Sequence, residues 1–440
     1  MKKFGLFSFL VLLTVSVLGL FSNGSHTSAG ITAIDTGDTA WLLTATGLVL
    51  LMTPGLAYFY GGMVSKKNVI STMFQSFIAM GVISILWVVV GFSIAFGESF
   101  HGIFGNPFTF FMFKDVGLAP DKAFAPTIPF LLFAMFQLKF AIITPALITG
   151  SFAERVSFKA YLLFMVLFSI FIYAPLAHMT WHPDGILRQM GVLDFAGGTV
   201  VHMSAGYAAL AGALILGRRK VHLKNQKHQP ANIPYVLLGT GLIWFGWFGF
   251  NAGSALSASG QAVLAFATTN TASAAAALAW IFFDVMVGRK PSALGACIGA
   301  VVGLVAITPA AGYVTIGQSL FIGTIASVIS NLAVSVKSKT TLDDTLDVFP
   351  CHGLGGITGM IATAVFAKDA GLIFGGTTTF FNHLLALAIV SAFAFTGSAI
   401  LYYLTNLITP LRVNDEMEET GLDLSQHGES TMDEPEPEFS

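Results

Sequence analysis

Charged residues are scarce in this chain, and cysteine is almost absent. Asp, Glu, Lys and Arg make up 10% of the 440 residues, against roughly a quarter in an ordinary soluble domain. The only cysteines, Cys297 and Cys351, lie in or beside apolar runs, so no disulfide framework can be inferred. With 55% hydrophobic residues and a mean hydropathy of +0.77, the composition indicates a membrane protein.

Basic residues are missing from the end of the sequence. From Val413 to Ser440 there are ten acidic residues and no Lys or Arg, so the net charge of −2 conceals a basic remainder. A segment with charge of one sign behaves differently from the rest of a chain. We therefore treat 413–440 as a separate acidic tail.

Long apolar runs, by contrast, are abundant. A bilayer core about 30 Å thick needs roughly 20 apolar residues per helix, and eleven windows meet that need. Continuous runs exclude a transmembrane β-barrel, whose strands alternate. The predicted fold class is an all-α polytopic membrane protein with eleven transmembrane helices, packed closely through its 46 glycines. The windows are 39–63, 70–97, 127–151, 157–180, 199–217, 232–254, 261–287, 292–310, 313–334, 351–367 and 382–408.

The first 29 residues have the layout of a secretory signal. Two lysines precede an apolar stretch, and small polar residues follow it, as in signals that are cleaved. The alternative is an uncleaved first span, because the apolar stretch is nearly long enough. We predict a cleaved signal at 1–29, a membrane domain at 30–412 and the tail at 413–440.

Loop charges predict the orientation. If the mature N-terminus is outside, fourteen Lys and Arg lie in cytoplasmic loops and four lie outside, as the positive-inside rule requires. Gaining or losing one span would scramble this asymmetry. We therefore expect the N-terminus outside and the C-terminus in the cytoplasm.

Eleven spans divide into two groups of five and one final helix. Two groups of five joined by a cytoplasmic loop must run in opposite senses, which makes an inverted repeat. The fifth span begins DFAGGTVVHMSAG and contains His202, and the tenth begins DVFPCHGLGGITG and contains His352. We expect the two histidines to meet near the middle, where neutral imidazoles can share one proton.

Two other uses of these histidines remain open at this stage. Each could be a structural hydrogen-bonding group between helices, since ionisable side chains inside a membrane need partners. Each could also ligate a metal, with Cys351 next to His352. No third ligand stands at a usual metal spacing, so we predict no metal, and we expect neither a cofactor nor a nucleic-acid partner.

Other polar and aromatic positions allow two interpretations. Asp194 can cap the fifth helix or attract a cation. The aromatics of WFGWFGFNAGSA, with Phe250 and Ser254, fit either an interfacial belt or a vestibule that binds a cation on aromatic faces, and Trp181 would lie on the same side. Phe140 follows Lys139, a buried cation that must find carbonyls, a carboxylate or water, or lose its proton.

These motifs resemble the ammonium transporters of the Amt/Mep/Rh superfamily, on the Amt branch. The resemblance runs from about residue 39 to 430. Its motifs are FYGGMVSKKNV (59–69), GSFAERVSF (150–158), DFAGGTVVHMSAG (194–206), WFGFNAGSA (247–255), DVFPCHGLGG (347–356) and GLDLSQHGE (421–429).

The resemblance implies a homotrimer in the bacterial plasma (inner) membrane, with one pore in each subunit. It implies that ammonium is recruited outside at Phe140, Trp181, Phe250 and Ser254, and that Phe140 and Phe250 form a gate. Ammonia would then pass His202 and His352, which relay the proton, while Asp194 aids deprotonation or holds the architecture. Potassium has no proton to give and would be excluded.

Two departures from the family pattern affect the interpretation. Lys139 stands where many members have a small or hydroxyl residue, and STM replaces the tyrosine that usually follows HGE in the tail. A regulatory partner of the PII type at the cytoplasmic face is therefore an open expectation. The alternatives to active ammonium uptake are a passive ammonia channel and a non-conducting ammonium sensor. We expect no enzyme activity.

Overall fold

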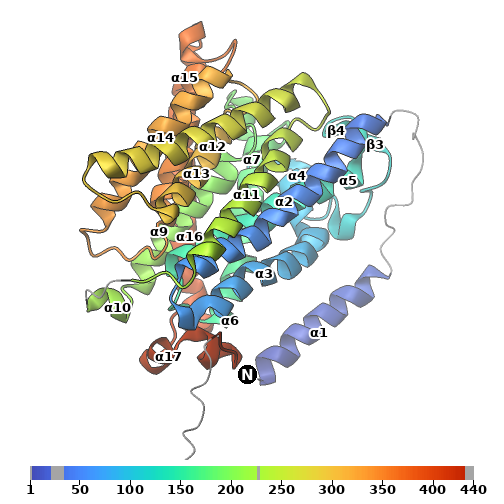
Figure 1. Ribbon diagram of the computed structural model, residues 1–440. Helices are drawn as coiled ribbons and strands as arrows, with labels where there is room; N and C mark the ends of the chain where they lie inside the picture. Colours follow the sequence, from blue (N-terminus) through green and yellow to red (C-terminus); the bar gives the residue numbers. More distant parts are fainter. Residues whose placement is uncertain (1, 21–33, 225–227, 432–440) are drawn as a thin grey trace, which may run out of the picture.

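The computed structural model describes residues 2–20, 34–224 and 228–431 as a bundle of long helices (Figure 1). Two small antiparallel hairpins lie between α4 and α5: β1 (Ser99–Phe100) pairs with β2 (Phe104–Gly105), and β3 (Pro120–Asp121) pairs with β4 (Ala125–Pro129). The α-helices are α1 Lys2–Gly19, α2 Thr36–Met63, α3 Val69–Leu86, α4 Phe92–Phe96, α5 Phe130–Phe152, α6 Phe158–Phe168, α7 Ala174–Trp181, α8 Ile186–Gln189, α9 Ser204–Leu216, α10 Lys220–Leu223, α11 Ile233–Gly253, α12 Gly260–Met286, α13 Ala293–Ile307, α14 Ile316–Lys337, α15 Leu354–Phe366, α16 Thr377–Ile408 and α17 Asp415–Thr420.

Several long helices contain or begin with a wider π-helical turn. Such single turns insert an extra residue and are frequent at functional sites. The π-helical turns are η3 Trp87–Gly91, η5 Ser169–Tyr173, η6 Gly198–Met203, η7 Phe349–Gly353 and η9 Asp423–His427, and the 3-10 turns are η2 Lys66–Asn68, η4 Phe111–Phe113 and η8 Leu372–Phe374. The turns η6 and η7 carry the two histidines singled out in the sequence.

The predicted helical membrane fold is confirmed, with a difference in the count of spans. Within the described residues, ten helical segments are long and apolar enough to cross a bilayer. The window at 292–310 became α13, which has 15 residues and is shorter than the usual span. The count of eleven is therefore not confirmed.

The N-terminal helix α1 lies at the edge of the bundle (Figure 1), and most of its side chains are exposed. Its contacts with the bundle include the Lys159 amine, which lies 5.8 Å from the centroid of the Phe4 ring. Cleavage of a signal stays a prediction, because residues 21–29 lie outside the described part of the chain.

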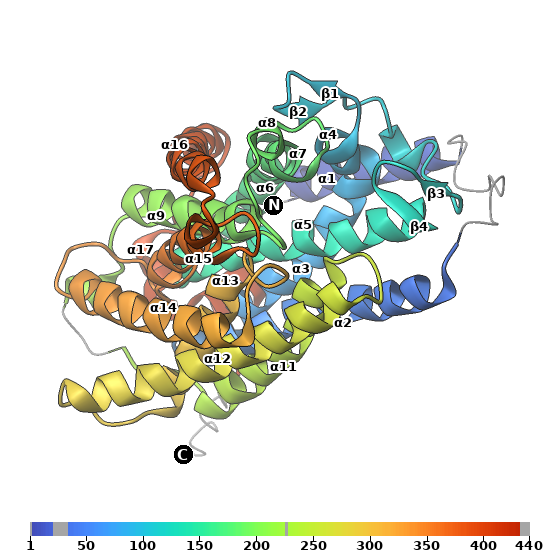
Figure 2. The ribbon, with the colours of Figure 1, turned by 90° about the horizontal axis from the view of Figure 1, so that it is seen from above.

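The two halves of the bundle pack on each other reciprocally. Helix α2 opens the first half and α11 opens the second, and the two lie side by side along their length (Figures 1 and 2). Deeper in the bundle, α9 contacts η7, while α15 contacts η6. A Cβ on Gly206 would lie 2.3 Å from the backbone nitrogen of Gly353. Glycine therefore allows the two histidine-bearing segments to touch backbone to backbone.

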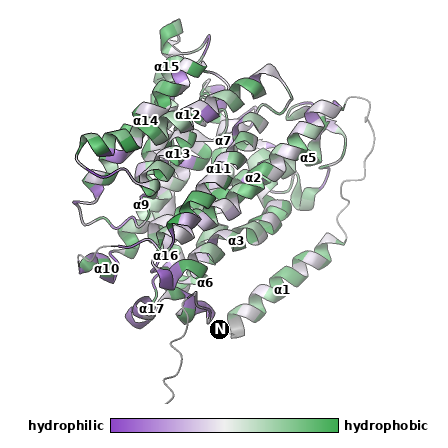
Figure 3. Cartoon of the chain, in the orientation of Figure 1, coloured by the Kyte–Doolittle hydropathy of each residue, from purple (hydrophilic) through white to green (hydrophobic). Residues whose placement is uncertain are grey.

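Polar residues gather at one end of the bundle, around α10 and α17, which we call the tail face (Figure 3). The end that carries the β-hairpins is called the hairpin face. The tail turns back onto its own chain: the Asp423 carboxylate accepts hydrogen bonds from the backbone N–H groups of Ile70 (3.1 Å) and Ser71 (2.7 Å). Gly421 has φ +103°, and a Cβ there would meet Lys67 at 2.6 Å. The tail is thus seated against the start of α3.

Candidate functional site

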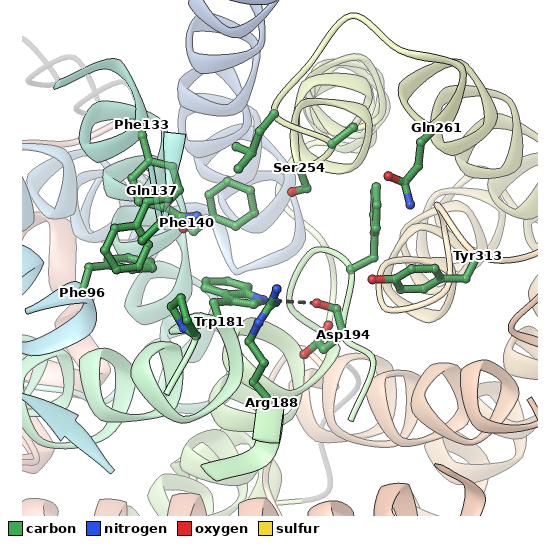
Figure 4. Close-up of a pocket in the computed structure, with 16 residues that line it drawn as sticks. Phe96, Phe133, Gln137, Phe140, Trp181, Arg188, Asp194, Ser254, Gln261 and Tyr313 are labelled. Carbon is green, nitrogen blue, oxygen red and sulfur yellow. Dashed lines mark hydrogen bonds between the residues drawn. The ribbon is translucent and has the colours of Figure 1, made fainter. Parts of the chain in front are cut away.

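A wide cavity of about 250 Å³ opens at the hairpin face (Figure 4). Its lining includes three of the predicted substrate-binding residues, Phe140, Trp181 and Ser254, together with Asp194. These residues come from α5, α7, the end of α11 and the loop before η6. The structure therefore collects at one cavity side chains that are separated by more than a hundred positions in the sequence.

Aromatic rings form the floor of this wide cavity. The Phe140 ring lies edge-on to Trp181, with centroids 5.9 Å apart, and lies against Phe250 at 4.2 Å. Phe140 and Phe250 are each at most 1% exposed. The hydroxyl of Ser254 donates to the Phe250 carbonyl at 2.8 Å, so its lone pairs face other groups. The aromatic pair closes the way from the wide cavity to the interior.

A narrow cavity of about 10 Å³ lies beyond the aromatic pair. His202 and His352 line it among apolar side chains such as Leu147, Ile243 and Val301. Trp247 stacks on His202, with centroids 5.3 Å apart, and donates its indole N–H to Thr308 at 2.9 Å. This space holds about one water-sized molecule, and the histidines supply its polar atoms.

The structure brings the two predicted pore histidines together. The Nδ1 atoms of His202 and His352 are 3.4 Å apart, and both rings are buried. At this separation one Nδ1 carries the proton and the other accepts it, since two protonated or two bare nitrogens would repel. The Nε2 atom of His202 is buried and has no hydrogen-bond partner within the described ranges. It is therefore left for a molecule in the narrow cavity.

The carboxylate of Asp194 accepts hydrogen bonds from the turn that follows it. Its Oδ1 accepts from the backbone N–H groups of Gly197 (2.8 Å) and Gly198 (2.7 Å). Its Oδ2 accepts from the N–H (2.7 Å) and the hydroxyl (2.5 Å) of Thr199. Four donors satisfy a carboxylate almost completely. Asp194 therefore caps η6, and of the two roles open in the sequence the structure provides the contacts for capping.

The second half contains a counterpart of this cap that lies outside the quoted motif. The two motifs begin at Asp194 and Asp347, but Asp344 is the residue that caps η7, accepting from the N–H groups of Val348 (3.1 Å) and Phe349 (2.8 Å). Asp347 instead pairs with Lys337 at 2.5 Å. Asp344 stands eight residues before His352, just as Asp194 stands eight before His202. The internal repeat is therefore closer than the quoted motifs suggested.

Two further residues of the sequence analysis lie away from this path. Lys139 is 8% exposed, lines neither cavity, and makes no hydrogen bond or ion pair within the described residues. Cys351 lines a second small space below His352, next to Tyr60. No three His, Cys, Asp or Glu side chains in the described part of the chain are grouped so as to hold a metal ion.

A buried ionic cluster lies at the tail face, beyond the narrow cavity. Arg219 bonds both oxygens of Asp343 at 2.9 Å and one oxygen of Glu154 at 2.6 Å. Burial raises the pKa of the Glu154 carboxyl, but the charges of Arg219 and His228 and the hydrogen bonds from Ser65 together hold that pKa at about 2. The hydrogen bonds and charge of Arg219 likewise hold the pKa of Asp343 below its ordinary range against burial. Both acids are therefore ionised at neutral pH.

Sequence reasoning missed several polar residues of the wide cavity, namely Gln137, Arg188, Gln261 and Tyr313 (Figure 4). Gln137 could have been found, because it lies three residues before Phe140 and so shares its helix face. Arg188 lies on the short helix α8, Gln261 in the first turn of α12 and Tyr313 in the connection between α13 and α14, so their approach to the cavity depends on tertiary packing. Gln137 Oε1 is buried without a partner in the described ranges, so it is an acceptor that a ligand can use.

Comparisons with known proteins agree on one family. The sequence matches the Ammonium Transporter Family over residues 40–432. The ammonium transporter of Aquifex aeolicus is 45% identical over 421 residues, which cover 94% of this chain and 97% of that protein. The crystal structure of Saccharomyces cerevisiae Mep2 has a TM-score of 0.82 at 34% identity, over 88% of this chain and 89% of that one. A structure described as a sensor Amt protein has a TM-score of 0.81 at 28% identity, over 89% and 98%.

Proposed function

The chain belongs to the ammonium transporter family, and on this premise we propose that it moves ammonium across the membrane by a deprotonation mechanism. Ammonium binds in the wide cavity, loses one proton, and passes as ammonia through the narrow cavity. His202 and His352 relay the proton. The observation that carries the proposal is the pair of imidazoles, with Nδ1 atoms 3.4 Å apart, among the otherwise mainly apolar side chains that line the narrow cavity.

Recruitment in the wide cavity follows from aromatic faces and hydrogen-bond acceptors. A small cation gains from the electron-rich faces of Trp181, Phe140 and Phe250, and its N–H groups need acceptors such as the Ser254 hydroxyl. The same faces attract potassium, since the two ions have the same charge and similar size. Recruitment alone therefore does not select ammonium.

Selection comes at the aromatic pair, because a bare ion cannot enter an apolar space about one water molecule wide without losing its solvation. Ammonium can leave its proton behind and enter as neutral ammonia. Potassium has no proton to give up and stays in the wide cavity. The paired imidazoles are neutral at rest and hydrogen-bond to each other. The proton that ammonium gives up to water passes along them, each ring being an imidazolium only while it carries the proton, and so accompanies the ammonia.

Asp194 contributes in this scheme by holding η6, and therefore His202, in position. A carboxylate that already accepts four hydrogen bonds has little capacity left to take the substrate proton. Its negative charge still lies beside the wide cavity and favours a cation there. We therefore assign it a positioning and electrostatic role.

The setting of the protein is proposed on the loop charges and on family membership. The chain is taken to be a homotrimer in a bacterial inner membrane, with the hairpin face outside and the tail face in the cytoplasm. This orientation gives the cytoplasmic loops fourteen Lys and Arg. A PII-type regulator would then meet the tail face, where α17 and η9 lie. The signal at 1–29 would be removed on export.

Current across a membrane distinguishes the proposal from its alternatives. Purified protein in liposomes on a solid-supported membrane is expected to give a transient current on addition of ammonium and none on addition of potassium. Ammonia flux without current, measured by internal pH, would replace the mechanism with a passive channel. The absence of both current and flux would favour a non-conducting sensor. The similarity to a sensor Amt protein is the reason for testing this alternative.

A further inference from the structure

One cationic side chain faces the wide cavity, and the mechanism above gives it no role. Arg188 lies on the single-turn helix α8 and is exposed. Among the described residues that line this cavity it is the sole Lys or Arg. Figure 4 shows it extending over the cavity near Trp181 and Asp194. A positive charge at a site that must attract a cation needs an explanation.

The charge of Arg188 is not cancelled by a partner. Its guanidinium forms no hydrogen bond or ion pair with any residue in the described ranges. The acid that lines the cavity, Asp194, accepts hydrogen bonds with both carboxylate oxygens from Gly197, Gly198 and Thr199. Arginine remains protonated at any relevant pH. A full positive charge is therefore presented to whatever enters.

The influence of Arg188 extends to another wall of the cavity. Tyr313 lies in the connection between α13 and α14. Burial raises the pKa of its hydroxyl and the Asp194 carboxylate raises it further, whereas Arg188 lowers it. Arg188 and Asp194 thus act on the same space with opposite signs.

We infer that Arg188 sets the affinity of the wide cavity for monovalent cations by repelling them, a role that rests on the recruitment site proposed above. Two unit charges 4 Å apart in water change an equilibrium constant by about fivefold, and by more beside apolar walls. Aromatic faces and Asp194 alone would hold a cation tightly. The guanidinium weakens that hold, so that a bound cation is released quickly to the aromatic pair or back to solvent. Because the interaction is with charge alone, it acts equally on ammonium and methylammonium.

A charge series at this position tests the inference. Arg188→Gln is expected to lower the half-saturating ammonium concentration of the current about three- to tenfold at low salt, and Arg188→Glu to lower it further. Arg188→Lys keeps the charge and is expected to retain the wild-type value. The differences should shrink in high salt, because the Debye length falls from about 30 Å at 0.01 M to about 3 Å at 1 M.

Lys114→Gln is the matched control. Lys114 is exposed on the connection that carries the β-hairpins but does not line the cavity, so this variant is expected to leave half-saturation unchanged. An equal shift in Lys114→Gln would mean that general surface charge is responsible, and the inference would fail. It also fails if Arg188→Lys behaves as Arg188→Gln does, or if the shift is independent of salt.

Failure of the inference is separable from failure of the recruitment site. Trp181→Leu, measured in the same assay, is expected to raise half-saturation because it removes an aromatic face. If Trp181→Leu does so and the Arg188 series has no effect, the site stands and the role of Arg188 is wrong. If neither has an effect, ammonium does not bind in the wide cavity. Thermal unfolding of each variant shows whether a loss of current reflects a loss of fold.

Discussion

At the scale of single residues, the two histidines of the narrow cavity have unlike surroundings. His202 stacks on Trp247 and has a buried Nε2 without a partner in the described ranges, whereas His352 also borders the small space that Cys351 and Tyr60 line. His202 thus lies on the side of the aromatic pair, with its ring centroid 6.1 Å from that of Phe250, and His352 lies on the side of the exit. The two ends of the histidine pair therefore differ, although the two rings share one hydrogen bond.

Replacing either imidazole by a carboxylate is expected to abolish the selection of ammonium over potassium. His202→Asp or His352→Glu places a negative charge in the apolar path, which favours bare cations instead of neutral ammonia. The ratio of ammonium to potassium currents should fall at least tenfold on a supported membrane. An unchanged ratio in both variants would mean that these histidines do not determine selectivity.

Lys139 provides a contrasting test, because it is buried but lines neither cavity. Lys139→Thr is expected to leave the ammonium current within about twofold. Lys139→Met is expected to raise the free energy of unfolding by about 1–3 kcal/mol, since a largely buried side chain whose amine has no partner in the described ranges is replaced by an apolar chain of similar length. A changed half-saturating concentration in either variant would instead put Lys139 on the transport path.

At the scale of elements, each histidine is positioned by a capped π-helical turn. Asp194→Ala is expected to lower the free energy of unfolding by about 2 kcal/mol or more, because several N–H groups lose their acceptor. Asp194→Asn keeps one acceptor oxygen and should cost less, while retaining part of the current. Unfolding midpoints and currents should therefore fall together across the two variants. A stable Asn variant with no current would identify Asp194 as the proton acceptor.

The long helices could be predicted from the sequence, and the capped turns could not. A continuous apolar run of about 20 residues has few other stable states in a membrane, so the windows agree with the observed helices. The span predicted at 292–310 is not confirmed for a local reason, since α13 is short and ends at Ile307 just before Pro309. The cap at Asp344 was missed because the quoted motif begins at Asp347. Only the backbone geometry shows which of the two aspartates accepts the N–H groups of η7.

The candidate site was predictable in part for a similar reason. The quoted family motifs contain His202, His352, Phe250, Ser254 and Asp194, and the resemblance adds Phe140 and Trp181. All seven line the wide or the narrow cavity. Arg188, Gln261 and Tyr313 belong to no motif. Their approach to the cavity depends on how the connections of the hairpin face fold over it, which a single sequence does not reveal.

At the scale of the whole molecule, the ionised groups of the buried cluster at the tail face stabilise the fold. The Glu154 carboxyl has a pKa of about 2 because Arg219, His228 and the hydrogen bonds from Ser65 together outweigh its burial, and a carboxyl whose pKa is lowered on folding stabilises the fold above its ordinary pKa. That contribution, about 3 kcal/mol for Glu154, is complete at neutral pH. It is lost as the pH falls from about 4.5 towards 2.

Glu154→Gln is therefore expected to unfold more easily than the wild type at pH 7. The two proteins should converge as the pH is lowered towards 2, because the wild-type carboxylate is then protonated. Unfolding midpoints recorded across this range test the expectation. Parallel curves for the two proteins would show that the Arg219–Glu154 pair does not contribute to acid stability.

The equal spacing of the two capping aspartates from their histidines has a consequence for descent. Asp194 to His202 and Asp344 to His352 are each eight residues, and each turn packs on the helix that follows the other. An ancestor of half this length, inserted in both senses, would already set its own histidine against that of a second copy. Gene fusion would then have added the freedom for the halves to diverge while both continue to line the wide cavity and the exit.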